Sequence, residues 1–262
     1  MSGLATAFAA MRREQRVGLV TFVTAGDPDL VRSRAIVRAI ARSGADVIEV
    51  GVPFSDPIAD GPAIQRATER ALAAGGQLSA TLDLIADVRP DVTAPLVLFT
   101  YVNPVLQMGE ERFVERAARA GVDGVLLLDL PIEESADMRT RLDRRGIDLV
   151  FLISPTTSDA RLREAARLGR GFLYAISRLG VTGARDQVAG TAAPLVARIR
   201  AVSELPVAVG FGLSRPEHLR EVGSYADAGV VGSALVEVIG RAASGPDVAG
   251  AAGAFVSWLK QA

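Results

Sequence analysis

Eight short runs of aliphatic and β-branched residues recur along this chain, and stretches with helical spacing alternate with them. The runs are almost continuously apolar, which is typical of strands buried on both faces of a parallel sheet. Eight β-α units in about 250 residues predict a (β/α)8 TIM barrel, and a doubly wound open sheet is the main alternative. The expected strands are VGLVTFVT (17–24), DVIEVG (46–51), APLVLFTY (94–101), GVLLLDL (124–130), DLVFLIS (148–154), GFLYAIS (171–177), PVAVGFG (206–212) and AGVVGS (228–233).

The segments between these runs have the spacing of amphipathic helices, and several end at a glycine, as helices commonly do. An extra amphipathic helix at the N-terminus is expected to plug the bottom of the barrel, and the tail ending AGAFVSWLKQA is expected to form a closing helix. Because no low-complexity linker divides the chain, we predict that residues 1–262 form a single TIM-barrel domain. The other expected helices cover 28–44, 61–75, 109–121, 133–146, 159–169 and 191–202.

The charge pattern limits the ligands and partners of the chain. The net charge is −1 and the charges are interspersed, so no basic face for nucleic acid is expected and a small neutral or anionic ligand is favoured. No apolar stretch is long enough to span a membrane. The chain has no cysteine, which rules out disulfides and thiolate chemistry and favours a reducing compartment, the cytoplasm.

A glutamate interrupts the second apolar run. Side chains alternate along a strand, so Glu49 shares a face with Val47 and lies near the carboxyl end, where TIM barrels carry their chemistry. A buried carboxylate needs a partner or a raised pKa, and a structural salt bridge is the alternative explanation. The loop that follows, 52–60, contains Asp56 and Asp60. Asp60 is expected to cap the next helix, to bring a second carboxylate toward Glu49 for acid–base chemistry, or to do both, since the two roles are not exclusive.

Glycine-rich turns follow the last three expected strands, at 177–184, 210–214 and 231–235. Glycine allows the backbone to approach an anion closely, and a Gly-Ser helix start offers unpaired N–H groups. Phosphate sites in barrels are often built from the loops after strands seven and eight. The three turns together therefore predict a phosphate site.

Aromatic residues also fall near the carboxyl ends of the strands. Core packing explains any one of them, but together they predict a flat, apolar, phosphorylated substrate. Asp129 is either a further polar contact or a structural acceptor, and His218 is expected to be structural. No metal site is expected, since no His or Cys cluster has ligand spacing. The aromatic residues of this rim are Phe22, Phe99, Tyr101, Tyr174 and Phe211.

These motifs resemble the family of tryptophan synthase α subunits over almost the whole chain, and the segment 48–65 is specific to that family rather than to barrels in general. The resemblance implies a lyase that cleaves indole-3-glycerol phosphate by a retro-aldol reaction to indole and glyceraldehyde 3-phosphate. The matching motifs are FVTAGDPD (22–29), IEVGVPFSDPIADGPAIQ (48–65), LFTYVNPV (98–105), LLLDLP (126–131), YAISRLGVTGAR (174–185), VGFGLS (209–214) and GSALV (232–236).

The resemblance also implies a role for each residue at a motif position. Glu49 would be the acid–base group acting at indole C3 and the glycerol hydroxyl, and Asp60 would stabilise charge at the indole nitrogen. The phosphate would be held by Gly183, Gly212, Gly232 and Ser233. The pocket for the indole and glycerol groups would be lined by Phe22, Tyr174 and Phe211.

The partner implied by the family is a pyridoxal-phosphate β subunit in an α2β2 complex, which receives indole through a tunnel. This chain itself is expected to hold no cofactor. Candidate partner surfaces are the 53–60 loop and the segment 101–109. The alternatives are a stand-alone indole-3-glycerol phosphate lyase, a non-catalytic phosphate-binding barrel subunit, and a barrel isomerase acting on a phosphosugar.

Overall fold

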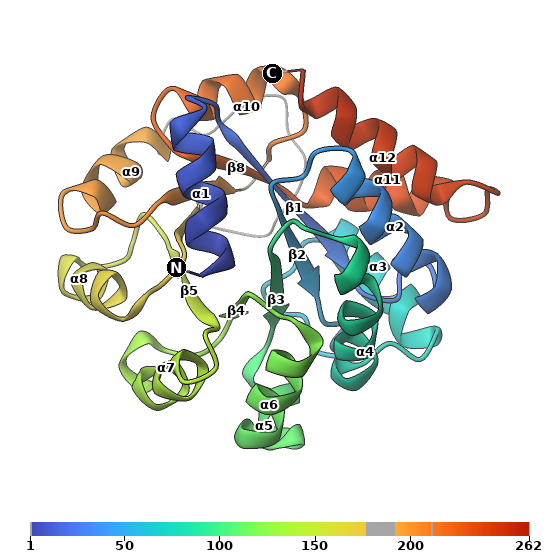
Figure 1. The fold of residues 1–262 in the computed structure, drawn as a ribbon, viewed down its shortest axis with the longest axis horizontal. Coiled ribbons are helices and arrows are strands. Elements are labelled where there is room, and N and C mark those ends of the chain that lie inside the picture. Colours follow the sequence, from blue (N-terminus) through green and yellow to red (C-terminus); the bar gives the residue numbers. More distant parts are fainter. Residues whose placement is uncertain (1, 177–191, 211, 262) are drawn as a thin grey trace.

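A computed structural model describes residues 2–176, 192–210 and 212–261 of the chain. Eight parallel strands pair in sequence order, and β1 pairs with β8, so the sheet closes into a barrel (Figure 1). Every strand lies inside one of the eight expected ranges. The prediction of a TIM barrel is therefore confirmed and the open sheet is wrong. The strands are β1 Gly18–Thr24, β2 Val47–Gly51, β3 Leu96–Thr100, β4 Gly124–Leu127, β5 Asp148–Ile153, β6 Leu173–Ile176, β7 Val207–Gly210 and β8 Ala228–Val231.

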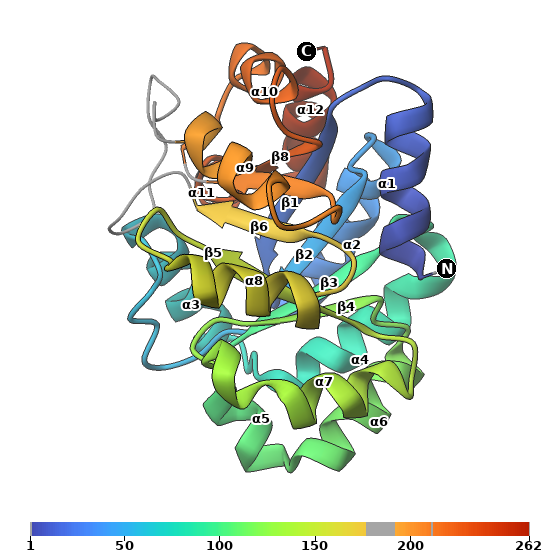
Figure 2. The same cartoon turned by 90° about the vertical axis from the view of Figure 1, so that its left-hand side faces the viewer.

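Helices surround the barrel, and α12 at the C-terminal end lies beside α2 and α11 (Figures 1 and 2). Four helices, α4, α5, α10 and α11, lie outside the ranges given for the expected helices. In the described residues, no helix is long and apolar enough to cross a membrane. The helices are α1 Gly3–Arg13, α2 Leu30–Arg42, α3 Pro62–Ala73, α4 Leu78–Val88, α5 Val102–Met108, α6 Glu110–Ala120, α7 Ala136–Asp143, α8 Asp159–Leu168, α9 Ala192–Arg200, α10 Pro216–Gly223, α11 Ser233–Ala242 and α12 Val248–Leu259, with 3₁₀ turns at Arg89–Asp91 and Ile132–Glu134.

Alternation along the strands divides the apolar residues into two layers. On β2, Val47 joins the cluster inside the barrel, whereas Ile48 and Val50 join the cluster between the sheet and the helices. Both faces of the strands are thus buried, which explains why the runs are continuously apolar.

Helix α1 closes the bottom of the barrel, as predicted. Its residues Leu4, Phe8 and Met11 recur at helical spacing and pack into the interior cluster, where each is at most 2% exposed. The rings of Phe8 and Phe172 lie 5.3 Å apart. The polar chemistry of the barrel interior is therefore restricted to its other end.

Aspartates at the start of the strands anchor this lower end. The carboxylates of Asp46, Asp123 and Asp227 accept the backbone N–H groups of Leu19, Leu96 and Val207 at 2.8–2.9 Å. Arginine or lysine side chains pair with the same carboxylates. These contacts satisfy backbone donors at the strand ends, which would otherwise lack partners.

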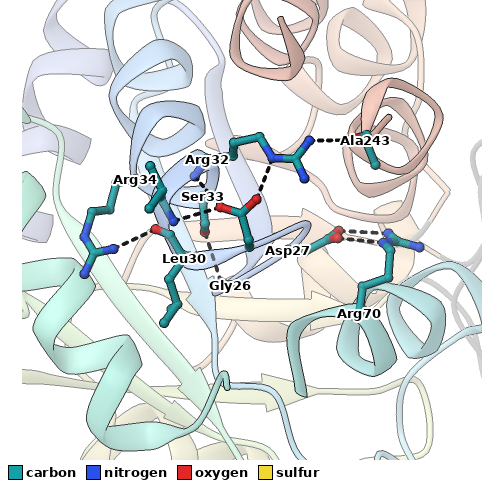
Figure 3. A network of polar contacts seen from close by, with 10 residues as sticks. Gly26, Asp27, Leu30, Arg32, Ser33, Arg34, Arg70 and Ala243 are labelled. Atoms are coloured by element: carbon teal, nitrogen blue, oxygen red, sulfur yellow. Dashed lines mark hydrogen bonds and ion pairs between the residues drawn. The ribbon is translucent and has the colours of Figure 1, made fainter. Parts of the chain in front are cut away.

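An ion pair between a buried aspartate and a partly exposed arginine stabilises the opposite end of the barrel. Asp27, in the turn after β1, is 2% exposed and accepts two hydrogen bonds from Arg70 of α3, at 2.7 and 2.9 Å (Figure 3). Arg32 of α2 binds Asp29 and also donates to the carbonyl of Ala243, beyond α11. The start of α2, the last turn of α3 and the end of α11 are thereby held in one network.

Candidate functional site

Glu49 points into the barrel from β2. It pairs in register with Phe22 of β1 and Val97 of β3, and it is 1% exposed. Its Oε1 atom has no hydrogen-bond partner among the described residues. A salt bridge, the alternative explanation from the sequence, is absent there. Because nothing in the described part of the chain compensates its charge, burial raises the pKa of Glu49 from 4.5 to about 8.

The loop after β2 brings Asp60 to the same end of the barrel. Pro53 and Pro57 restrict the backbone of this loop, and the N–H of Asp60 closes a turn on the carbonyl of Pro57 at 3.0 Å. The capping role considered for Asp60 is wrong, since Gly61 is the N-cap residue of α3 and Pro62 is its first helical residue. The side chain of Asp60 is therefore available for another function.

The Asp60 carboxylate is 9% exposed and accepts a hydrogen bond from the Tyr101 hydroxyl at 3.2 Å. Burial raises the pKa of Asp60 to about 6, and the Tyr101 hydrogen bond opposes that increase. The pKa of Glu49 is therefore higher than that of Asp60. Between pH 6 and 8, Glu49 is mainly protonated while Asp60 is mainly ionised.

Both carboxyl groups line one cavity at the carboxyl ends of the strands, with about 630 Å³ of open space including its mouth. Its walls are largely apolar, and the rings of Phe22 and Phe99 meet edge to face at 5.2 Å. This combination of apolar walls with a few convergent polar groups is typical of small-molecule sites. The remaining lining residues are Ala59, Ile64, Leu128, Leu152, Tyr174, Gly212, Leu213, Val230, Gly232, Ser233 and Ala234.

Tyr174 of β6 is buried near Glu49 and lines the cavity. Burial, and after it the charge of Glu49, raises the pKa of Tyr174, so its hydroxyl stays protonated. Its position depends on Gly210 of β7, because a Cβ atom there would lie 2.2 Å from the Tyr174 hydroxyl oxygen. Glycine at 210 is thus required for the tyrosine to pack against the wall.

The predicted phosphate residues that the structure describes line the same cavity as Glu49 and Asp60. Gly232 is the N-cap residue of α11 and Ser233 begins the helix, without a side-chain cap. The first N–H groups of a helix lack intrahelical partners and attract anions. Gly212 has a φ of +89°, a conformation that favours glycine. Gly183 and Phe211, the remaining predicted site residues, lie outside the described residues.

The structure also shows the hydrogen bonds of three other polar residues, Asp129, Asp56 and His218. Asp129 is a structural acceptor, because its Oδ1 atom accepts the N–H of Val102 at the start of α5 at 2.7 Å. Asp56 is exposed and accepts from Ser55. His218 is buried in α10 and accepts the N–H of Ser214, which agrees with a structural role. No group of three or more His, Asp or Glu in the described ranges could hold a metal ion.

The sequence analysis missed several cavity residues. Leu128 and Leu152 look like ordinary core residues in the sequence, but they stand at the ends of β4 and β5 and face the cavity. Tyr101 was recognised only as an aromatic residue, and its hydrogen bond to Asp60 was not foreseen. The general signal for such residues is their place at the end of a barrel strand.

Comparisons with known proteins agree on one family. A family model described as the tryptophan synthase alpha chain matches residues 8–257. The chain is 49% identical over 265 residues to the tryptophan synthase alpha chain of Geobacter sulfurreducens, covering 100% of this chain and 99% of that one. It is 49% identical over 250 residues to that of Methylococcus capsulatus, with 95% and 94% covered. A crystal structure of tryptophan synthase subunit alpha from Legionella pneumophila matches with a TM-score of 0.89 at 34% identity, covering 100% and 98%.

Proposed function

Because the chain belongs to the tryptophan synthase alpha chain family, we propose that Glu49 and Asp60 perform the family's reaction in the cavity described above. The chain is a lyase of tryptophan biosynthesis that cleaves indole-3-glycerol phosphate to indole and glyceraldehyde 3-phosphate. The observation that carries the residue assignment is the pair of buried carboxyl groups with different pKa values in one apolar cavity. Such a pair is a common arrangement for acid–base chemistry near neutral pH.

Glu49 is assigned both proton transfers. In its protonated form it donates a proton to indole C3, which leaves positive charge on the ring nitrogen. The resulting carboxylate then takes the proton of the glycerol hydroxyl next to the ring as the carbon–carbon bond breaks and its electrons return to the ring. One proton is given and one is taken, so Glu49 ends each cycle protonated.

Asp60 is assigned the stabilisation of the ring nitrogen. As an ionised group in a water-poor apolar cavity, it would interact more strongly with a developing positive charge than it would in bulk water. Phe22 and Tyr174 provide flat walls for the indole and glycerol groups. The first N–H groups of α11, at Gly232 and Ser233, would bind the phosphate together with Gly212, and Gly183 and Phe211 are proposed to complete the site.

The partner of this chain is the family's β subunit, and we propose an α2β2 complex. The two segments expected to form the interface, 53–60 and 101–109, line one surface groove with α4 and α6. Beside it, the side chains of Ile58 and Leu106 are 85% and 57% exposed. Large exposed apolar side chains around a groove are typical of a protein interface.

We propose that the whole chain forms a single domain that works in the cytoplasm. Residues 1–262 form one domain, because α1 packs into the apolar cluster inside the barrel, α12 packs into the cluster between the sheet and the helices, and the same strands contribute to both clusters. The absence of cysteine supports a reducing compartment, and we propose the cytoplasm.

The test of the residue roles is indole release from indole-3-glycerol phosphate by the purified chain with a β subunit present. Glu49→Gln and Asp60→Asn should each lower kcat by about 10²-fold or more. Asp137→Asn, which removes an exposed carboxylate from α7, outside both the cavity and the proposed interface, is the control and should keep the wild-type rate. Near-normal turnover in either active-site variant would remove that residue from the mechanism.

Repeating the assay without the β subunit separates the complex from a stand-alone lyase. We expect strong activation by the partner. Ile58→Asp should weaken that activation, whereas Val202→Asp, at the other end of the barrel, should not. Equal rates with and without the partner would favour the stand-alone enzyme.

A further inference from the structure

We propose that Tyr101 is a positioning residue for the reaction: its hydroxyl group holds the Asp60 carboxylate in place and is itself fixed by the N–H of Ala59. Tyr101 stands directly after β3 and is 3% exposed. It does not line the cavity that holds Glu49, and it acts through Asp60. The inference rests on the proposed role of Asp60.

Two hydrogen bonds define the direction of the Tyr101 proton. The N–H of Ala59 donates to the Tyr101 oxygen at 3.0 Å, and the Tyr101 hydroxyl lies 3.2 Å from Asp60 Oδ2. A backbone N–H can only donate, so the tyrosine oxygen must accept that bond. Its own proton is then directed to Asp60, whose ionised carboxylate can only accept.

The tyrosine ring is also fixed by its surroundings. Its centroid lies 5.2 Å from that of Phe54, which belongs to the same loop as Asp60. On the other side, Val102 starts α5 and is bound by Asp129 at the end of β4. The hydroxyl is thus carried by a part of the barrel that is separate from the Asp60 loop, and its bonds to Ala59 and Asp60 join the two.

The other ionisable groups around the pair would not replace this hydrogen bond. Asp129, which follows β4, is acidic. Burial raises the pKa of Tyr101, and the charges of Asp60 and Asp129 raise it further, so the hydroxyl stays protonated. Glu49 on β2 is acidic and buried in the adjoining cavity. Tyr174 on β6 also stays protonated. Within the described residues, Tyr101 is the group whose hydrogen bond lowers the pKa of Asp60.

Removing the hydroxyl should therefore raise the pKa of Asp60. A hydrogen bond to a carboxylate lowers its pKa by roughly one unit, so Tyr101→Phe should shift Asp60 from about 6 to about 7. The fraction of ionised Asp60 at pH 6 would fall about fivefold for such a shift. The low-pH limb of indole formation should move up by the same amount.

The experiment measures the Asp60 pKa directly by carbon-13 NMR of the carboxyl carbons in the full chain. Asp60→Asn identifies the resonance. The wild type is compared with Tyr101→Phe and with Tyr225→Phe, which removes a hydroxyl near the start of β8 and should leave both the pKa and the activity profile unchanged. The pH profile of kcat/KM for indole formation is recorded on the same proteins, and unfolding midpoints confirm that each variant is folded.

We expect an increase of about one unit in the Asp60 pKa and in the low-pH limb for Tyr101→Phe alone. An unchanged Asp60 pKa in that variant would overturn the inference. If the Asp60 pKa rises but the activity profile stays in place, the hydrogen bond exists without serving the reaction. That result would overturn the role of Asp60 in the proposed function, so the two failures are distinguishable.

Discussion

Replacing Glu49 by glutamine should stabilise the fold at neutral pH, by an amount that grows as the pH rises. Burial raises the pKa of Glu49 from 4.5 to about 8, so the folded protein holds this proton more tightly than the unfolded chain does. For an acid whose pKa is raised by folding, the stability is full below pH 4.5 and falls as the pH rises to 8. Glutamine cannot ionise, so the variant escapes this loss.

The size of the effect follows from the two pKa values. They differ by about 3.5 units, and each unit corresponds to about 1.4 kcal/mol. The free energy of unfolding of the variant, relative to the wild type, should therefore increase by about 1 kcal/mol at pH 5, about 3 kcal/mol at pH 7 and approach about 5 kcal/mol above pH 8. Glu49 is fully buried, so solvent screening reduces this value little.

The assay is urea-induced unfolding of both proteins at pH 5, 7 and 9, because the midpoint and slope give the free energy of unfolding. Other titrating groups are common to both proteins and cancel in the difference. Asp56→Asn controls for the loss of an exposed negative charge and should show no comparable trend. A difference between wild type and Glu49→Gln that stays constant over this pH range would refute the raised pKa.

Three further substitutions test other parts of the structure. Arg70→Met leaves the Asp27 carboxylate buried without its partner and should lower the free energy of unfolding by about 2–3 kcal/mol, which is less than for a fully buried pair because Arg70 is partly exposed. Urea-induced unfolding measures this change, and a decrease below about 0.5 kcal/mol would contradict the importance of the ion pair. Phe8→Ala opens a cavity where α1 plugs the barrel and should lower the free energy of unfolding by about 3–5 kcal/mol in the same assay. The folded variant should retain its kcat at low temperature, and a loss of kcat would contradict a purely structural role for α1. Gly210→Ala places a Cβ 2.2 Å from the Tyr174 hydroxyl oxygen and should lower kcat/KM for indole formation by about tenfold to hundredfold. Unchanged kinetics would show that Tyr174 can move without an effect on the reaction.

The strands were predictable because they are buried on both faces, which leaves uninterrupted apolar runs in the sequence. Glu49 was predictable for the same reason, since a carboxylate stands out in such a run and the two-residue period of a strand fixes the side on which it lies. The N-terminal plug was recognisable from its amphipathic pattern. These features depend on residues close together in the sequence.

The features that were missed depend on contacts between distant residues. Nothing near Tyr101 in the sequence indicates that its hydroxyl meets Asp60, which lies 41 residues earlier. The Asp27–Arg70 pair spans 43 residues. The capping role weighed for Asp60 followed a correct local preference of Asp, but Gly61 and Pro62 begin α3 one residue later. Helix α5 begins directly after β3, in a segment that the sequence analysis treated only as a surface.

The central claim is that one cavity holds a protonated Glu49 beside an ionised Asp60. The most direct test is the pH dependence of kcat/KM for indole formation, which reports the ionisations of the free enzyme. The account predicts a bell-shaped profile, with a rise governed by Asp60 near pH 6 and a fall governed by Glu49 near pH 8. A kcat/KM that is constant from pH 5 to 7, or that continues to rise above pH 8, would contradict it.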